Sequence, residues 1–269
     1  MKLVQRFMTK NPCYKAGQKI KVKGLMLHSV GCPQPKASAF ISSWNQESYD
    51  RACVHAFIDG NDGAVYQTLP WDFRGWHCGG AGNDTYIGVE MCEPDCIQYT
   101  GGANFICTNK NAAKATVKRT YESAVELFAY LCKVYGLNPL ADGVILSHKE
   151  GCKRGIAANH GDPEHLWNGL DMGYFMDGFR KDVMSALQGA VKESEKAAEK
   201  ETEAYLVRVE IPDLNIRTGP GTHFARTGKY TGVGTFTIVE ETDGLGAAKW
   251  GKLKSGAGWI ALDYTERVA

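Results

Sequence analysis

The sequence predicts an α/β domain with a central mixed sheet flanked by helices, followed by a small all-β barrel. Up to residue 187, apolar segments typical of buried strands alternate with segments of helical periodicity. From residue 205 onward, the chain contains only short alternating segments punctuated by glycine. The 269 residues exceed the length of most single domains, so two hydrophobic cores are expected.

Five strands are expected in the first domain, two of them in a hairpin. Residues 21–28 (KVKGLMLH) and 87–91 (IGVEM) form apolar runs of the kind found in buried strands. Residues 54–69 predict a hairpin, because two apolar segments flank the strong turn signal DGNDG at 59–63. Residues 144–146 (VIL) give one more short strand.

Helices are expected between and after these strands. Residues 114–136 carry apolar side chains at helical spacing, and Gly136 followed by Pro139 provides a stop signal. Residues 172–187 predict a second helix with an apolar face. Strands alternating with helices in this way indicate an α/β core.

A polar break separates this domain from the rest of the chain. Residues 188–204 (QGAVKESEKAAEKETEA) contain almost no large apolar side chain, and pairs such as Glu193 and Lys196 stand at helical spacing. The segment is therefore expected to be a charged linker, either coil or a solvated helical spacer. This places the predicted domains at residues 1–187 and 205–269.

Composition excludes several functional classes. Lysine and arginine (31) nearly balance aspartate and glutamate (30), which argues against a nucleic-acid-binding protein. No apolar run approaches the roughly 18 residues of a membrane span, and residues 1–17 lack the apolar stretch of a secretory signal. The nine cysteines are odd in number, which favours folding in a reducing cytosol over a disulfide framework.

Two histidines and a carboxylate suggest a metal site. His28 ends a buried strand, His148 follows the last short strand, and Asp162 comes shortly after. Side chains at these strand ends can converge at one edge of a sheet. Two imidazoles and a carboxylate suit catalytic zinc, which keeps a fourth position open for water. Cys152 and His165 are also chemically able to bind zinc, and spacing alone does not exclude them.

Several ordered sequence blocks resemble one enzyme family. They extend over roughly residues 20–170 and resemble the type-2 N-acetylmuramoyl-L-alanine amidases of autolysins and phage endolysins, whose fold is that of the peptidoglycan recognition proteins. The blocks are GLML with His28, the hairpin HAFIDGNDGAVYQ, GWHCGG, IGVE ending in Glu90, SHKEG with His148, and AANHGDPEHLW.

This resemblance assigns roles to five residues. It implies that His28, His148 and Asp162 bind zinc, and that Glu90 activates or orients the attacking water. His160 occupies a position commonly held by lysine, so its implied role is to stabilise the oxyanion of the tetrahedral intermediate. Histidine in place of lysine is a departure from the family pattern, because a neutral imidazole is the weaker partner for an anion.

The resemblance also implies a substrate and a biological setting. The expected reaction is cleavage of the amide bond between N-acetylmuramic acid and L-alanine in peptidoglycan, with Trp76 and His77 lining the substrate groove. The stretch 149–159 is longer than in many relatives. A phage or prophage endolysin is expected, made in the cytoplasm and released to the wall by lysis or a holin. The alternatives are an autolysin, an endopeptidase, or a non-catalytic peptidoglycan-binding protein of the same fold.

The C-terminal segment resembles a second known module. The run LNIRTGPGTHFARTG, followed by WGKL and GWI, is similar to the bacterial SH3-like cell-wall-binding domain. Ile216 is expected to turn inward, and at least one of Trp250 and Trp259 is expected in the core. Candidates for stacking on peptide or sugar are a partly exposed tryptophan and Tyr205, Tyr230 and Tyr264.

Overall fold

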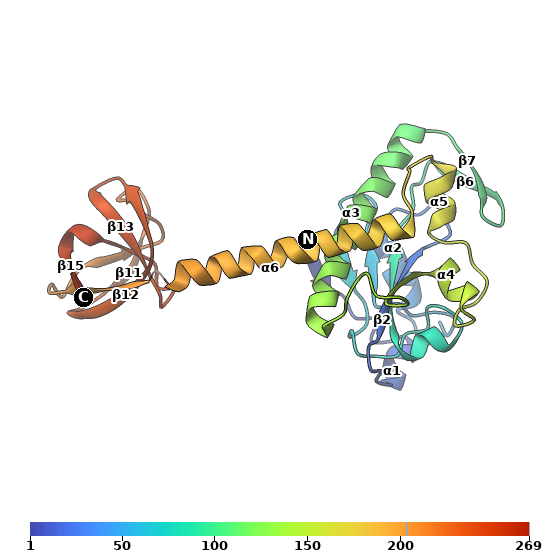
Figure 1. Ribbon diagram of the computed structural model, residues 1–269, viewed down its shortest axis with the longest axis horizontal. Coiled ribbons are helices and arrows are strands. Elements are labelled where there is room, and N and C mark those ends of the chain that lie inside the picture. The colour runs from blue at the N-terminus through green and yellow to red at the C-terminus, as the bar shows by residue number, and fades with distance from the viewer. Residues whose placement is uncertain (203, 269) are drawn as a thin grey trace. The chain divides into compact units, whose positions relative to one another are not determined.

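The computed structural model (Figure 1) describes residues 1–202 and 204–268. The chain divides into two compact units, Met1–Gly189 and Ala190–Ala269. Among the described residues, no helix has both the length and the apolar character needed to cross a membrane.

The first unit is built on a mixed sheet of six strands in the order β1-β4-β3-β5-β2-β8. The strands β3 and β4 form the predicted hairpin and are antiparallel, whereas every other neighbouring pair is parallel. In chain order the strands are β1 (Leu3–Gln5), β2 (Gly24–Ser29), β3 (Ala56–Ile58), β4 (Val65–Gln67), β5 (Tyr86–Met91) and β8 (Ile145–Ser147). This sheet confirms the predicted α/β class.

Two long helices pack on one face of the sheet. Helix α3 (Lys110–Tyr135) begins at Asn109, whose side chain accepts a hydrogen bond from the amide of Ala112, and ends at Gly136 in the left-handed conformation. Helix α6 (Met176–Thr202) contributes its first turns to the same core. The core joins these helices to inward side chains of the central strands: Leu25, Leu27, Ile87, Val89, Val117, Phe128, Phe179 and Val183.

A second apolar cluster covers part of the opposite face. It contains Phe57 from β3 and Phe40 from α2 (Ala37–Trp44), whose rings stack 5.2 Å apart. Cys13 of the short helix α1 (Pro12–Ala16) belongs to the same cluster. Because strand side chains alternate between faces, residues on this side include His28 and Glu90.

Three short elements surround the carboxyl ends of the central strands. Helix α4 (His148–Lys153) starts directly after β8, helix α5 (Glu164–Gly169) follows a loop, and β6 (Ile97–Gly101) pairs with β7 (Asn104–Cys107) in a hairpin. The 3-10 turn η1 (Ala81–Asp84) precedes β5. The β6–β7 hairpin was not expected from the sequence.

The predicted linker is helical in the structure. Helix α6 begins at Met176 and continues to Thr202, so of the two forms expected for residues 188–204 the helical one is observed up to that residue. The predicted helix at 172–187 therefore starts four residues too early. The division into compact units falls between Gly189 and Ala190, whereas the functional domains assigned to 1–187 and 205–269 stay a prediction.

After helix α6, the second unit forms a sheet of seven strands in the order β11-β10-β14-β13-β12-β9-β15, with all neighbours antiparallel. Ile216 and Trp250 are buried, and Trp259 is half-buried. The elements are β9 (Tyr205–Val209), β10 (Asn215–Arg217), β11 (Arg226–Tyr230), β12 (Gly234–Gly244), β13 (Ala247–Leu253), β14 (Trp259–Ala261), η2 (Leu262–Tyr264) and β15 (Thr265–Val268).

Candidate metal centre and active site

The parallel register of β2 and β5 brings His28 beside Glu90. Their neighbours Leu27 and Val89 point into the core under α3, so alternation directs His28 and Glu90 to the opposite face. His148 is the first residue of α4 and follows β8, the other parallel neighbour of β2. The carboxyl ends of adjacent parallel strands therefore present these side chains together.

The loops that carry His148 and Asp162 are fastened to each other. Ser147 caps α4 by accepting a hydrogen bond from the amide of Glu150, while its hydroxyl donates to Oε1 of Glu164 at 2.9 Å. The amide of Lys149 also donates to the carbonyl oxygen of Asp162 at 3.3 Å. These bonds hold the start of α4 against the loop before α5.

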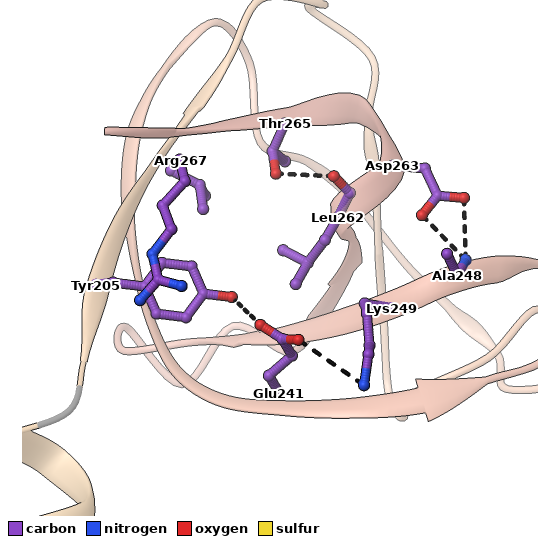
Figure 2. Close-up of a pocket in the computed structure, with 9 residues that line it drawn as sticks. Tyr205, Glu241, Ala248, Lys249, Leu262, Asp263, Thr265 and Arg267 are labelled. Carbon is purple, nitrogen blue, oxygen red and sulfur yellow. Dashed lines mark hydrogen bonds and ion pairs between the residues drawn. The ribbon is translucent and has the colours of Figure 1, made fainter. Parts of the chain in front are cut away.

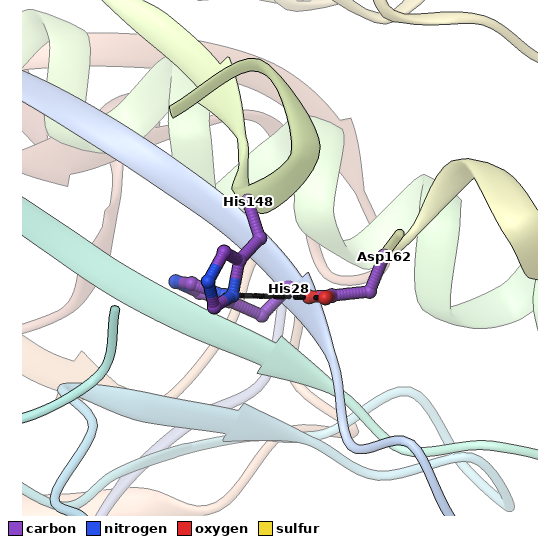
Figure 3. A group of neighbouring side chains, drawn as sticks. All are labelled: His28, His148 and Asp162. Atoms are coloured by element: carbon purple, nitrogen blue, oxygen red, sulfur yellow. Dashed lines mark hydrogen bonds and ion pairs between the residues drawn. The ribbon is translucent and has the colours of Figure 1, made fainter. Parts of the chain in front are cut away.

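His28, His148 and Asp162 form a compact buried cluster (Figure 3). One ligand atom from each lies within 4.8 Å of the others, and among the described residues this is the one such group found. Nδ1 of His28 lies 3.0 Å from Nδ1 of His148 and 3.4 Å from Oδ2 of Asp162. The alternatives lie elsewhere: Nε2 of His165 is 2.7 Å from the Tyr99 hydroxyl, and Cys152 faces Asn159.

The protonation states of the cluster favour cation binding. Burial, followed by the neighbouring His28, lowers the pKa of His148 to about 4, so its imidazole is neutral near neutral pH. Burial alone raises the pKa of Asp162, but the neighbouring His28 and His148 outweigh it and hold this pKa below its ordinary value. Neutral imidazoles and a carboxylate are the forms that bind metal ions.

Glu90 carries an unpaired oxygen beside this cluster. The side chain is half-buried, and Oε2 has no hydrogen-bond partner among the described residues. Burial, reinforced by the charges of Asp162 and Glu93, raises the pKa of Glu90 well above its ordinary value. A carboxylate in this condition is suited to accept and return a proton.

His160 lies on the outer side of the cluster. Its ring stacks on that of His148, with centroids 4.5 Å apart and an interplanar angle of 21°. Nδ1 is 3.7 Å from Oδ1 of Asp162, yet the side chain is 62% exposed. His160 is therefore placed to meet a ligand that approaches the cluster from solvent.

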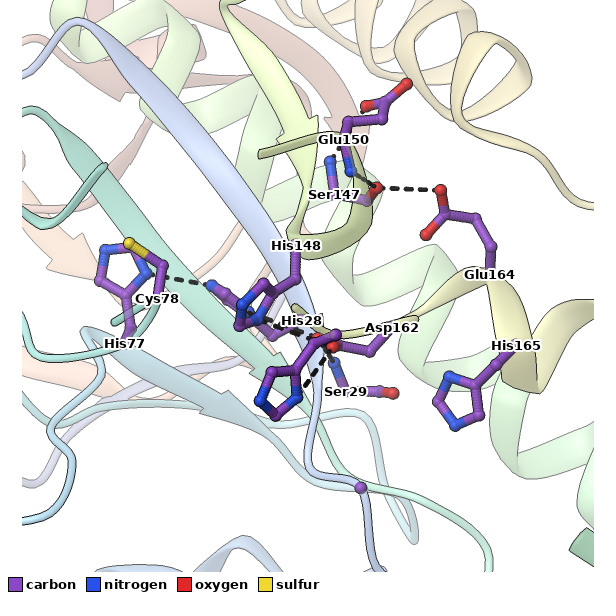
Figure 4. Close-up of polar contacts among 12 residues, drawn as sticks. His28, Ser29, His77, Cys78, Ser147, His148, Glu150, Asp162, Glu164 and His165 are labelled. Carbon is purple, nitrogen blue, oxygen red and sulfur yellow. Dashed lines mark hydrogen bonds and ion pairs between the residues drawn. The ribbon is translucent and has the colours of Figure 1, made fainter. Parts of the chain in front are cut away.

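His77 was expected to contact substrate, and this expectation stays a prediction. The side chain is 8% exposed and lies beside His28, with Nδ1 at 3.0 Å from Nε2 of His28 (Figure 4). Nε2 of His77 is 3.1 Å from the carbonyl oxygen of Tyr86. Trp76 is half-buried and packs against the apolar cluster around Phe57, so its predicted contact with substrate stays a prediction.

Comparison with known proteins places this chain in an enzyme family. Residues 18–165 match the N-acetylmuramoyl-L-alanine amidase family, and this match spans more than half of the chain. The chain belongs to this family. The resemblance drawn from the sequence blocks is thereby confirmed.

Individual amidase relatives are distant. The bifunctional autolysin of Staphylococcus aureus is 25% identical over 146 residues, which is 52% of this chain but only 10% of the autolysin. The hydrolase AmiA of Staphylococcus aureus, solved with its ligand, is 22% identical and superposes with a TM-score of 0.54. That superposition covers 70% of this chain and 83% of AmiA, and it establishes a shared fold.

A second polar cluster beside the amidase site was not predicted. Glu93 is fully buried, accepts a hydrogen bond from the Tyr99 hydroxyl at 2.7 Å, and accepts another from the amide of Gly31 at 3.0 Å. The Tyr99 hydroxyl also lies 2.7 Å from Nε2 of His165. Burial raises the pKa of Glu93 to about 7 despite these bonds. The cluster fastens the β6–β7 hairpin to α5 and to the end of β5, and so holds this hairpin near Asp162.

Proposed function

We propose that this protein is a zinc-dependent peptidoglycan amidase that hydrolyses the bond between N-acetylmuramic acid and L-alanine. The observation that carries the proposal is the buried group of His28, His148 and Asp162, with the unpaired oxygen of Glu90 beside it. Membership of the amidase family supports the reaction class.

The donor set fits zinc. Two imidazole nitrogens and one carboxylate oxygen are a three-ligand set found at catalytic zinc, which leaves a further position for water or substrate. The three side chains are 1%, 5% and 6% exposed, so they lose little additional solvation on binding an ion. When bound, zinc polarises a substrate carbonyl and makes water a stronger acid.

Glu90 supplies the proton transfer. Its unpaired Oε2 accepts the proton of the attacking water, and the raised pKa then lets the carboxylic acid release that proton to the leaving nitrogen. The first step requires the ionised carboxylate, and the second uses the carboxylic acid that the first step forms. Its register position beside His28 places it on the reacting side of the sheet.

His160 meets the developing negative charge. Because it is exposed on the solvent side of His148, a ring N–H of His160 can donate to the oxyanion of a substrate held at the cluster. The exposed position also means that water competes for this donor. Its contribution is therefore expected to be smaller than that of Glu90.

The C-terminal unit binds the cell wall in this proposal. It contains a shallow pocket of about 280 Å³ between β9, β13 and β15 (Figure 2). The guanidinium of Arg267 lies 3.9 Å from the centroid of the Tyr205 ring, and the Tyr205 hydroxyl donates to Glu241, which faces Lys249. An aromatic ring beside charges of both signs suits peptide, so among the three candidate tyrosines this pocket favours Tyr205.

Truncation tests this division of roles. A fragment of residues 1–189 should hydrolyse a small muramyl peptide normally but lose activity on intact walls, because tethering raises the local concentration at a polymer. The isolated unit 205–269 should sediment with purified wall, and Tyr205→Ala should weaken that sedimentation. If the wild-type unit stays in the supernatant, the wall-binding role is wrong.

Analysis of digested wall tests the reaction itself. Mass spectrometry of purified peptidoglycan treated with the protein should show glycan strands free of stem peptide and peptides that begin with L-alanine. Peptide fragments cut within the stem would instead identify an endopeptidase. Unchanged wall that retains the protein would identify a binding protein. Acting on peptidoglycan, the enzyme works at the wall after release from the cell, as an endolysin or an autolysin does.

A further inference from the structure

A line of hydrogen bonds runs from the backbone of β5 through His77 to His28. Figure 4 shows the bond between His77 and His28. The carbonyl oxygen of Tyr86, 3.1 Å from Nε2 of His77, has only lone pairs to offer. His77 must therefore carry a hydrogen on Nε2. A neutral imidazole has one N–H, which leaves Nδ1 of His77 as an acceptor.

The tautomer of His28 follows from that of His77. Since Nδ1 of His77 accepts, Nε2 of His28 at 3.0 Å must donate. Neutral His28 then has a lone pair on Nδ1, the atom that faces His148 and Asp162. That lone pair is the one a metal ion requires. The opposite tautomer of His28 would point an N–H at the ion.

Packing holds His77 in this orientation. Gly88 of β5 leaves the space that the ring occupies, since a Cβ at this position would lie 2.3 Å from Cγ of His77. The backbone amide of His77 donates to Oδ1 of the buried Asn83 at 2.9 Å. The ring also lies edge-on to the rings of His28 and His55.

We propose that His77 is a positioning residue for His28. The backbone carbonyl of Tyr86 fixes the tautomer of His77, and His77 in turn fixes the tautomer and ring orientation of His28 and thereby strengthens metal binding. This inference rests on the zinc site of the proposed function. Partners of this kind behind a metal ligand typically contribute about 10–100-fold in metal affinity. In most such sites the partner is a carboxylate, carbonyl or water; here a second imidazole lies between ligand and carbonyl.

Two variants of the full chain isolate the acceptor. His77→Asn places an amide oxygen near the position of Nδ1, whereas His77→Leu offers no acceptor, and both lose the bond to Tyr86. Zinc affinity, measured by competition with a chromophoric chelator, should fall about 10–100-fold in His77→Leu. In His77→Asn most of the affinity should return. His55→Leu is a matched control, because His55 is also buried but bonds its two ring nitrogens to the backbone of Gly88 and Phe73.

A measurement on the wild-type chain avoids any loss of folding in the variants. Nitrogen-15 NMR of the metal-free protein should show both His28 and His77 protonated at Nε2 alone. Protonation of His28 at Nδ1, or equal zinc affinities for wild type and His77→Leu, would overturn the inference while leaving the zinc site intact. Failure of the wild-type chain to bind zinc would overturn the proposed function, and this inference with it.

Discussion

His77 and His160 flank the two histidines of the proposed metal site, His28 and His148, from opposite sides, and their surroundings differ sharply. His77 lies beside His28, is 8% exposed, and has both ring nitrogens within hydrogen-bond distance of a partner. His160 stacks on His148 with a side chain that is 62% exposed. A buried ring fixed by partners can set the state of a ligand before substrate arrives. An exposed ring can only respond to what binds. We call the buried side of the site around His77 its floor and the exposed side around His160 its rim, so the floor is preorganised and the rim is adaptable.

Removal of a cluster member should have the largest effect. Asp162→Ala leaves two imidazoles where three ligands are needed, so we expect substoichiometric zinc and wall hydrolysis reduced to background. Metal analysis of the purified protein and turbidity loss of cell walls measure the two quantities. Cys152→Ser is the matched control and should retain both. Full zinc content in Asp162→Ala would exclude Asp162 as a ligand.

Glu90→Gln should separate proton transfer from metal binding. The amide keeps the size of the side chain but removes the basic oxygen, so kcat should fall about 10²–10⁴-fold with zinc content unchanged. In the wild type, activity should fall as pH drops through the raised pKa of Glu90, because only the ionised carboxylate accepts a proton. The variant should lose this acidic limb of its pH profile. Loss of zinc in the variant would make Glu90 a ligand instead.

The floor and the rim were not equally predictable from the sequence. Buried parallel strands appear as apolar runs, so residues 21–28 and 87–91 could be assigned, and the strand ends indicated where His28 and His148 meet. The place of His77 could not be predicted in this way. It depends on the empty space over Gly88, which only the register of β5 against its neighbours defines.

Glu93 and Tyr99 show a second limit. Glu93 lies beyond the end of β5, where alternation no longer indicates which way a side chain points. Tyr99 belongs to a hairpin of mixed polar and apolar residues, and although Gly101-Gly102 marks its turn, Tyr99 meets Glu93 only through tertiary packing. In the linker, the charged residues at helical spacing allowed a helix but did not decide between helix and coil, and α6 continues to Thr202.

On the rim, His160→Ala should reduce kcat by roughly tenfold, below the loss for a buried oxyanion donor, because water partly replaces an exposed donor. His160→Lys should keep or raise kcat, since a lysine ammonium is a stronger partner for an anion. Initial rates on a soluble muramyl peptide, at zinc saturation, measure both. Unchanged kcat in His160→Ala would remove His160 from the catalytic group.

The smallest expected effect concerns stability at the floor. Burial lowers the pKa of His55 to about 4, against the opposing effect of its bonds to Phe73 and Gly88. Between the unfolded value near 6.5 and this folded value, the unfolded chain takes up a proton that the folded chain does not. Stability should therefore decrease as pH falls through this window, by about 1 kcal/mol between pH 6.5 and 5.5 from His55 alone.

Comparison with a non-titrating side chain isolates that contribution. His55→Gln retains an amide that can donate to the carbonyl of Phe73 but takes up no proton, so the variant should be less stable at pH 7 yet lose less stability on acidification. Urea unfolding of both metal-free proteins at pH 7 and 5.5 gives the two differences. Because Glu93 titrates in both proteins, its effect cancels in the comparison. Equal pH dependence would mean that His55 is not held neutral by burial, and the contrast between a preorganised floor and an adaptable rim would then rest on His77 alone.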